Sequence, residues 1–138
     1  MRTILVVDDE KSVRDSIKMI LEYEKYQVLF AENGAKALAL FREQPVDAVL
    51  LDIKMPSGMD GLEVLRALRQ LTTDVPVIMI SGHGTFETAV EATKSGAFDY
   101  LAKPLDRDKL LITLRNALER RQLAAEVSQL RAKDRILG

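Results

Sequence analysis

The chain has 138 residues, of which 47% are hydrophobic and 30% charged, and its formal net charge is −1. About 100–200 residues is typical of one domain, so we expect a single globular domain with at most a short appendage. The balanced charge gives no basic excess for binding nucleic-acid phosphates, and the lack of cysteine excludes disulfides, thiolate zinc sites and cysteine nucleophiles. No apolar stretch approaches the roughly 20 residues of a membrane span. The short apolar run at residues 4–7 ends in acids, unlike a signal peptide, so we expect a cytoplasmic protein.

Short apolar runs and helical patterns alternate five times along the chain. Each run is nearly continuous, which is typical of a strand buried on both faces, and the segments between carry apolar residues at helical spacing. The expected strands are Thr3–Val7, Gln27–Ala31, Val46–Leu51, Val75–Ile80 and Phe98–Ala102. The expected helices begin near Lys11, Gly34, Asp60, Thr85 and Arg107. This alternation predicts an α/β fold, a (βα)5 flavodoxin-like doubly wound parallel sheet with strand order 2-1-3-4-5.

The last helix is expected to continue beyond the domain core, because no glycine or proline occurs between Asp106 and Asp134. After Arg121 its apolar residues move to a different helical face. They are spaced four, three and seven residues apart, a heptad-like seam with Asp134 as a polar interruption. The residues of this seam are Leu123, Val127, Leu130 and Leu137. We therefore interpret residues 1–120 as the domain and residues 121–138 as a helical linker or dimerisation segment, with a solvated, frayed helix as the alternative.

Polar side chains follow the expected strands at the point where each ends: Asp8 and Asp9, Asp52, Ser81 and Lys103. In a parallel sheet these ends share one edge, which is where ligands bind. Three carboxylates close together would repel one another and have raised pKa values unless a cation neutralised them. An oxygen-only ligand set favours Mg²⁺ (or Mn²⁺). The alternatives are a turn or cap for Asp52 taken alone, and unrelated surface acids for the set.

A carboxylate beside a metal ion, a hydroxyl and a lysine suits phosphoryl transfer. Asp52 would be the nucleophile that forms an acyl phosphate. Lys103 would supply a fixed positive charge and Ser81 a hydrogen bond to the phosphoryl oxygens. Pro104 follows Lys103 and allows a cis peptide bond that would aim the lysine, although trans is the default form.

Four motifs together resemble the receiver domain of two-component response regulators. They are Leu5-Val6-Val7-Asp8-Asp9, Leu51-Asp52-Ile53-Lys54-Met55-Pro56, Ile80-Ser81 and Tyr100-Leu101-Ala102-Lys103-Pro104. The resemblance covers about residues 3–120, and the joint spacing is far more specific than any single motif. It implies that Asp52 accepts a phosphoryl group from a sensor histidine kinase.

The same resemblance assigns roles to the other residues of the edge. It implies that Asp9 and Asp52 ligate Mg²⁺ directly, that Asp8 acts through water and that the backbone carbonyl of Lys54 is a third protein ligand. It also implies that Ser81 and Tyr100 form a switch pair, in which Tyr100 moves inward as Ser81 is drawn to the phosphoryl group.

Further segments are similar to the NtrC-like group of sigma-54-dependent activators, namely residues 80–85, 89–92 and 96–101. Residues 135–138 resemble the lead-in to the AAA+ ATPase domain of these proteins. The similarity implies a transcription-activating effector beyond this chain. The seam in the last helix suggests a homodimer, and we expect it to form through the fourth helix, the fifth strand and the last helix, through the C-terminal helical segment, or through both.

One departure from the family lies between Pro56 and Gly61, where Ser57-Gly58 looks like a one-residue insertion whose effect stays open.

We expect a phosphoacceptor rather than an enzyme, with no direct contact to nucleic acid or membrane. An aspartyl-phosphate hydrolase would use similar carboxylates, but no insertion here is long enough for a substrate-recognition cap. A stand-alone phosphorelay receiver and a plain interaction module are also compatible with a chain of this size. Retention of all the edge residues argues against the interaction module.

Overall fold

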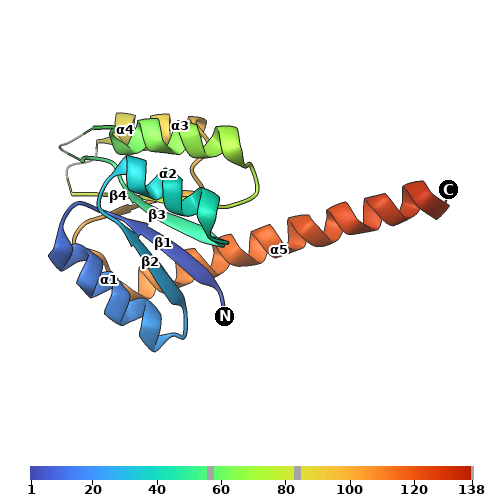
Figure 1. Ribbon diagram of the computed structural model, residues 1–138, viewed down its shortest axis with the longest axis horizontal. Helices are drawn as coiled ribbons and strands as arrows, with labels where there is room; N and C mark the ends of the chain where they lie inside the picture. Colours follow the sequence, from blue (N-terminus) through green and yellow to red (C-terminus); the bar gives the residue numbers. More distant parts are fainter. Residues whose placement is uncertain (56–57, 83–84, 138) are drawn as a thin grey trace.

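The computed structural model describes residues 1–55, 58–82 and 85–137, with side chains through residue 133. Within these ranges five strands alternate with five helices (Figure 1). The strands are β1 Thr3–Val7, β2 Gln27–Ala31, β3 Ala48–Asp52, β4 Val77–Ser81 and β5 Asp99–Ala102. The helices are α1 Lys11–Tyr23, α2 Gly34–Glu43, α3 Gly61–Leu71, α4 Phe86–Lys94 and α5 Arg107–Leu137.

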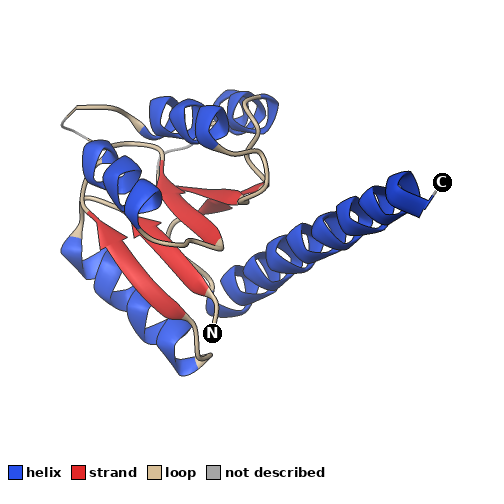
Figure 2. Cartoon of the chain, turned by 45° about the vertical axis from the view of Figure 1, so that its right-hand side comes forward, coloured by secondary structure: helices blue, strands red, loops and turns tan. Residues whose placement is uncertain are grey.

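The strands form one parallel sheet in the order β2-β1-β3-β4-β5, with helices on both of its faces (Figure 2). Every residue of β3 and β4 is buried, as their continuous apolar sequences predict for central strands covered on both sides. The predicted (βα)5 fold and strand order are therefore confirmed.

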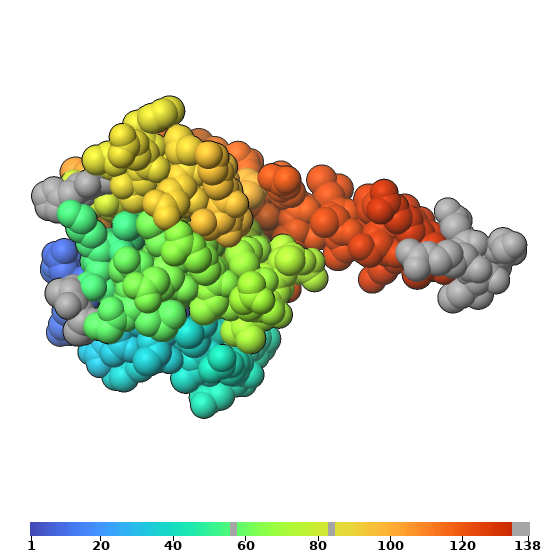
Figure 3. All heavy atoms as spheres, turned by 90° about the horizontal axis from the view of Figure 1, so that it is seen from above, coloured from blue at the N-terminus to red at the C-terminus, as the bar shows by residue number. Residues whose placement is uncertain are grey.

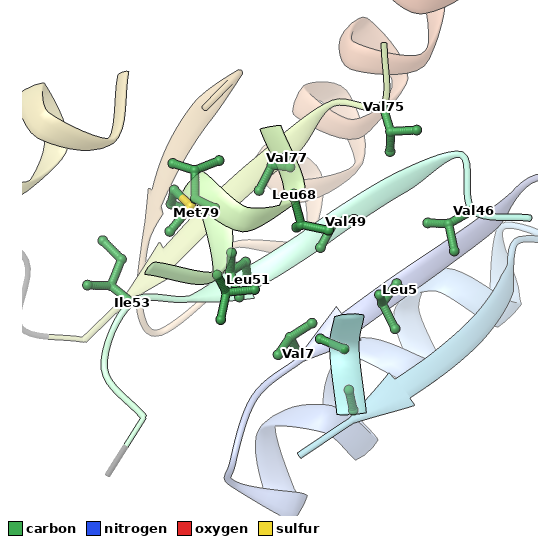
Figure 4. Packing of buried hydrophobic residues seen from close by; sticks show 14 of the residues in the cluster. Leu5, Val7, Val46, Val49, Leu51, Ile53, Leu68, Val75, Val77 and Met79 are labelled. Carbon is green, nitrogen blue, oxygen red and sulfur yellow. The ribbon is translucent and has the colours of Figure 1, made fainter. Parts of the chain in front are cut away.

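Two apolar clusters hold the helices to the sheet. Because side chains alternate along a strand, Leu5, Val49 and Met79 pack with α2, α3 and α4, whereas Ile4 and Leu50 pack with α1 and α5. Figure 4 shows Leu5, Val49 and Met79 along β1, β3 and β4. All five of these side chains are fully buried. The sheet is thus a close-packed platform that fixes where each strand ends.

The two central strands begin later than their apolar sequences predict. β3 begins two residues after the expected Val46, and β4 begins two residues after Val75. Both valines are nevertheless buried. Pro76 precedes β4 and has no N–H to donate to the ladder, so the strand starts behind it. At the other end both strands extend one residue further, which places Asp52 and Ser81 inside the sheet.

Helix α5 has two parts. Its first part packs against the sheet through Leu110, Leu114 and Leu118, which are buried. At about 1.5 Å per residue, its 31 residues span roughly 46 Å, and the second part projects from the body of the domain (Figure 3). Among the described residues, none of the helices combines the length and the apolar character that a membrane span requires.

The expected seam lies on this projecting part. Leu123 and Leu130 are each 61% exposed and Val127 is 45% exposed. The predicted members Asp134 and Leu137 fall outside the described side chains. The seam is therefore an exposed apolar stripe wherever its side chains are described.

Gly61 is the position where α3 approaches the end of β3. Its N–H donates to the carbonyl oxygen of Ile53 at 2.7 Å. A Cβ at residue 61 would lie 2.1 Å from the carbonyl oxygen of Asp52 and 2.5 Å from the Cα of Ile53. Both of these neighbours are backbone atoms, so a side chain at residue 61 would displace the strand end that carries Asp52.

We predict that Gly61→Ala lowers the free energy of unfolding by about 3 kcal/mol, the upper end of the usual cost of overpacking, because backbone must move. Urea denaturation measures this difference. Gly82→Ala is the matched control, since its Cβ would meet nothing nearer than 3.7 Å, and we expect a change within about 0.5 kcal/mol. Equal stability of the two variants would contradict the prediction.

Candidate functional site

Charged side chains from three strand ends meet at the carboxyl edge of the sheet. Asp8 follows β1, Asp52 ends β3 and Lys103 follows β5. Asp8 and Asp52 are neighbours because β1 and β3 are adjacent strands, with Val7 opposite Leu51. The exposed fractions of Asp8 and Asp52 are only 1% and 3%, which is rare for carboxylates unless they are paired.

Lys103 supplies the pairing charge. Its Nζ lies 2.9 Å from Asp8 Oδ2, 3.4 Å from Asp52 Oδ2 and 3.9 Å from Glu10 Oε1. Its backbone N–H donates to the carbonyl oxygen of Ser81 at 2.8 Å, and the Lys103–Pro104 peptide bond is cis, the form that the sequence allows. The structure therefore brings the predicted lysine together with two of the predicted acids.

The two buried carboxylates share this one ammonium group. Burial, and then the charge of Asp8, raise the pKa of Asp52 from 3.8 to about 6, because Lys103 and the backbone of Lys54 offset only part of the penalty. Burial by itself would lower the pKa of Lys103, but Asp8 and Asp52 outweigh it and the pKa is raised. The site thus holds more negative charge than its lysine neutralises.

The loop after β1 adds further acidic groups. Carboxylate oxygens of Asp8, Asp9 and Glu10 lie within 4.8 Å of one another. Arg14 Nη1 donates to the Asp8 carbonyl oxygen at 2.7 Å, and the Glu10 N–H donates to Asp8 Oδ1 at 2.9 Å. Asp8 Oδ2 is buried, and its charged neighbour within the described residues is Lys103 Nζ at 2.9 Å.

This set of donors fits a hard divalent cation. Its members are carboxylate oxygens at close spacing, and the Lys103 ammonium beside them is shared between the buried Asp8 and Asp52. The sequence predicts Asp8, Asp9, Asp52 and the Lys54 carbonyl as ligands. Among the described residues the carboxylates that lie within 4.8 Å of one another are those of Asp8, Asp9 and Glu10, while Asp52 contacts Lys103 at 3.4 Å.

Glu10 is the member of the acidic group that the sequence does not single out as a ligand. The signal that would have found it is its place directly after two acids, at the entrance to α1. Nothing in the strand pattern distinguishes it from an ordinary helix-capping acid.

The predicted switch residues lie on one face of the sheet. Ser81 follows Ile80, which pairs with Asp52, and Tyr100 pairs with Met79. Side-chain alternation therefore places Ser81, Met79 and Tyr100 on the same side. Ser81 is 3% exposed. Tyr100 packs against the cluster beneath α3 and α4, and its hydroxyl is buried without a hydrogen-bond partner in the described residues, so the ring already lies inward here.

The loop after β3 is bonded to Asp52 at its start. The Lys54 N–H donates to Asp52 Oδ1 at 3.4 Å, and the Lys54 side chain is exposed. Pro56 and Ser57 lie outside the described residues, so the predicted insertion is described only at Gly58, where φ is +77°. That positive φ favours glycine at this position.

We predict that Asp52→Asn stabilises the metal-free domain at pH 8 by about 2–3 kcal/mol, because each pKa unit between folded and unfolded states corresponds to about 1.4 kcal/mol. The raised pKa means that the folded state holds the Asp52 proton more tightly. The stability that protonated Asp52 contributes to the folded state is therefore lost as pH rises from about 4 to about 6. Urea denaturation of both proteins in EDTA should show their curves converging near pH 4. A constant difference at all pH values would contradict this account.

Comparisons with known proteins agree with this geometry. The sequence matches the family of response regulator receiver domains over residues 4–115. The putative response regulator NtrX-like of Rickettsia bellii is 46% identical over 131 residues, which cover 94% of this chain and 27% of that protein. The transcriptional regulatory protein ZraR of Klebsiella oxytoca is 45% identical over 121 residues, which cover 88% of this chain and 27% of that protein.

Solved structures show the same relationship. The receiver domain protein (CheY-like) of Methanospirillum hungatei superposes with a TM-score of 0.85 at 32% identity, covering 90% of this chain and 98% of that one. NtrX from Brucella abortus superposes with a TM-score of 0.88 at 42% identity, covering 94% of this chain and 30% of that one.

The chain spans 27% of the length of the two curated relatives, and the resemblance to NtrC-like regulators is confirmed at the level of this domain. A parallel sheet in the order 2-1-3-4-5, an acidic carboxyl edge and a lysine that pairs with it are what the family match leads one to expect. The chain belongs to the family of response regulator receiver domains.

Proposed function

We propose that a sensor histidine kinase phosphorylates this receiver on Asp52. The observation that supports this most directly is the position of Lys103 Nζ between the buried oxygens of Asp8 and Asp52. Asp52 ends its strand next to a fixed positive charge, and the Lys54 N–H holds its other oxygen. Asp8 is less suited to attack, because its two contacts are closer: the Glu10 N–H and Lys103 Nζ each lie 2.9 Å from an Asp8 oxygen, whereas the Lys54 N–H and Lys103 Nζ each lie 3.4 Å from an Asp52 oxygen.

The proposed reaction is a direct transfer. An Asp52 carboxylate oxygen attacks phosphorus, the bond from phosphorus to the histidine nitrogen of the kinase breaks, and the imidazole takes the electron pair. Lys103 stabilises the charge on the phosphoryl oxygens and the Ser81 hydroxyl donates to one of them. A bound Mg²⁺ or Mn²⁺ would neutralise those oxygens further. Asp8, Asp9 and Asp52 would hold it with the Lys54 carbonyl, and Glu10 is a further carboxylate beside them.

Helix α4 is the element whose displacement after phosphorylation would cost the least free energy. Ala92 is its one buried residue, whereas α3 buries four, and a weakly packed element opens most easily. An ion pair of 2.6 Å between Glu91 and Arg66 ties it to α3. Phosphorylation adds about 1.5–2 negative charges beside Lys103. We propose that the resulting change reaches α4, β5 and α5 through Ser81 and Tyr100.

We further propose that the output is a change in homodimerisation that controls a C-terminal effector. The exposed stripe of Leu123, Val127 and Leu130 supports a helix-to-helix contact, and Phe86 on α4 is 84% exposed and offers a second apolar surface. The short span of this chain relative to its curated relatives supports an effector beyond residue 138 rather than a stand-alone phosphorelay receiver. In this proposal the protein is cytoplasmic and acts on no separate substrate.

Incubation with acetyl phosphate and Mg²⁺ should add the mass of one phosphoryl group. Asp52→Asn and EDTA should each abolish the addition, because one removes the nucleophile and the other the cation. Intact-protein mass spectrometry measures this, with Asp15→Asn as the matched control, since Asp15 is an exposed acid on α1. An adduct of equal yield on Asp52→Asn would disprove the assignment.

Lys54→Ala should change the lifetime of the phosphoryl group by about threefold to tenfold, because this exposed side chain follows the acceptor by two residues and its charge acts on the attacking water. Loss of the adduct after removal of acetyl phosphate gives the lifetime. Lys109→Ala removes an exposed lysine in the first turn of α5 and should leave the lifetime unchanged. Equal lifetimes for Lys54→Ala and wild type would refute this role.

A further inference from the structure

One turn of α5 ties its projecting part to the domain. Arg121 Nη1 donates to Asp47 Oδ1 at 2.7 Å. The other oxygen of Asp47 accepts from the Thr3 N–H at 2.8 Å, and the Asp47 N–H donates back to the Thr3 carbonyl oxygen at 2.8 Å. Asp47 is thus fixed to the start of β1 by two bonds before it meets the helix.

Arg120 and Gln122, which flank Arg121 in the sequence, also contact the domain. The Arg120 guanidinium lies 5.7 Å from the centre of the Phe98 ring, and Arg2 Nη2 donates to Gln122 Oε1 at 2.9 Å. Residues 120–122 therefore reach the amino ends of β1, β3 and β5 at once. We call these six residues with Thr3 the helix clasp.

Beyond the clasp, no hydrogen bond or ion pair in the described part of the chain joins residues 123–133 to the domain. The side-chain bond from Gln122 to Glu126 lies within the helix. A groove of about 900 Å³ separates this part of α5 from the loops before β4 and β5, with Asp74, Ala97 and Ser128 among its walls. The helix has room to tilt, so its direction depends on the clasp.

We propose that Asp47 is the positioning residue that fixes the direction of the projecting part of α5 relative to the sheet. A lone surface ion pair contributes little, because two flexible side chains must be ordered. Here Asp47 is already ordered by Thr3, and Asp47 and Arg121 are each only 32% exposed. Asp47 also directly precedes β3, so the helix-directing residue and Asp52 lie at opposite ends of the same strand.

The test is a distance measurement on the whole chain by electron double resonance, and labelling is specific because the sequence has no cysteine. Spin labels at Met19→Cys on α1 and Gln129→Cys on α5 report the direction of the helix, and both sites are exposed. A second pair at Met19→Cys and Ile112→Cys lies wholly on the packed domain and reports its integrity. Labelled protein is diluted with unlabelled protein so that only distances within one chain are measured.

Asp47→Asn keeps the bond to Thr3 but removes the charge that Arg121 binds. We expect it to broaden the Met19–Gln129 distance distribution about twofold, with no effect on the Met19–Ile112 distribution, since a charge-assisted hydrogen bond is lost. Arg121→Gln should do the same, and the double variant should be no broader than either single variant. Arg115→Ala removes an exposed arginine of α5 outside the clasp and should leave both distributions unchanged.

Three results would overturn the proposal. They are an unchanged Met19–Gln129 distribution in both single variants, an additive broadening in the double variant, and a fall in helix content by circular dichroism. The last would mean that the pair stabilises the helix itself rather than its direction. None of these readouts requires phosphorylation, so the proposal fails or stands independently of the proposed function.

Discussion

The structure depends on the burial of two carboxylates beside one ammonium group. Asp8 and Asp52 are almost wholly excluded from water, and Lys103 reaches both from the far side of β4. Removing a charge from water costs several kcal/mol, and attraction to one lysine does not fully return it for two acids. The pKa of Asp52 is raised because Lys103 offsets only part of the cost of burying the charged carboxylate beside Asp8. Binding of a further cation would stabilise such a site. The site also presents a carboxylate whose charge is poorly neutralised.

The fold makes this arrangement possible. In a parallel sheet every strand ends at the same edge, so residues distant in sequence arrive together without a dedicated loop. Gly61 lets α3 begin against the end of β3, and Arg14 holds the backbone of Asp8 from α1. The apolar clusters on both faces keep the strand ends in register. The chemistry at the edge is therefore a consequence of how tightly the middle of the sheet is packed.

Sequence-based prediction succeeds where the signal is local or periodic. The apolar runs predict the strands, and the polar residues that end them predict Asp8, Asp52, Ser81 and Lys103 at one edge. Glu10 escapes prediction because its side chain joins the acidic group only through the turn into α1. The pairing of Asp47 with Arg121 also escapes, because these residues are 74 positions apart and neither stands in a recognisable pattern. The predicted starts of β3 and β4 are too early because Val46 and Val75 are buried outside the ladder.

The central claim is that Asp52, and not one of its acidic neighbours, carries the phosphoryl group. Reduction of the acetyl phosphate-treated protein with borohydride converts an acyl-phosphorylated aspartate to homoserine, which peptide mass spectrometry locates to a single residue. We expect homoserine at position 52 alone. Homoserine at position 8 or 9, or none at any position despite a phosphoryl adduct on the intact protein, would contradict the claim.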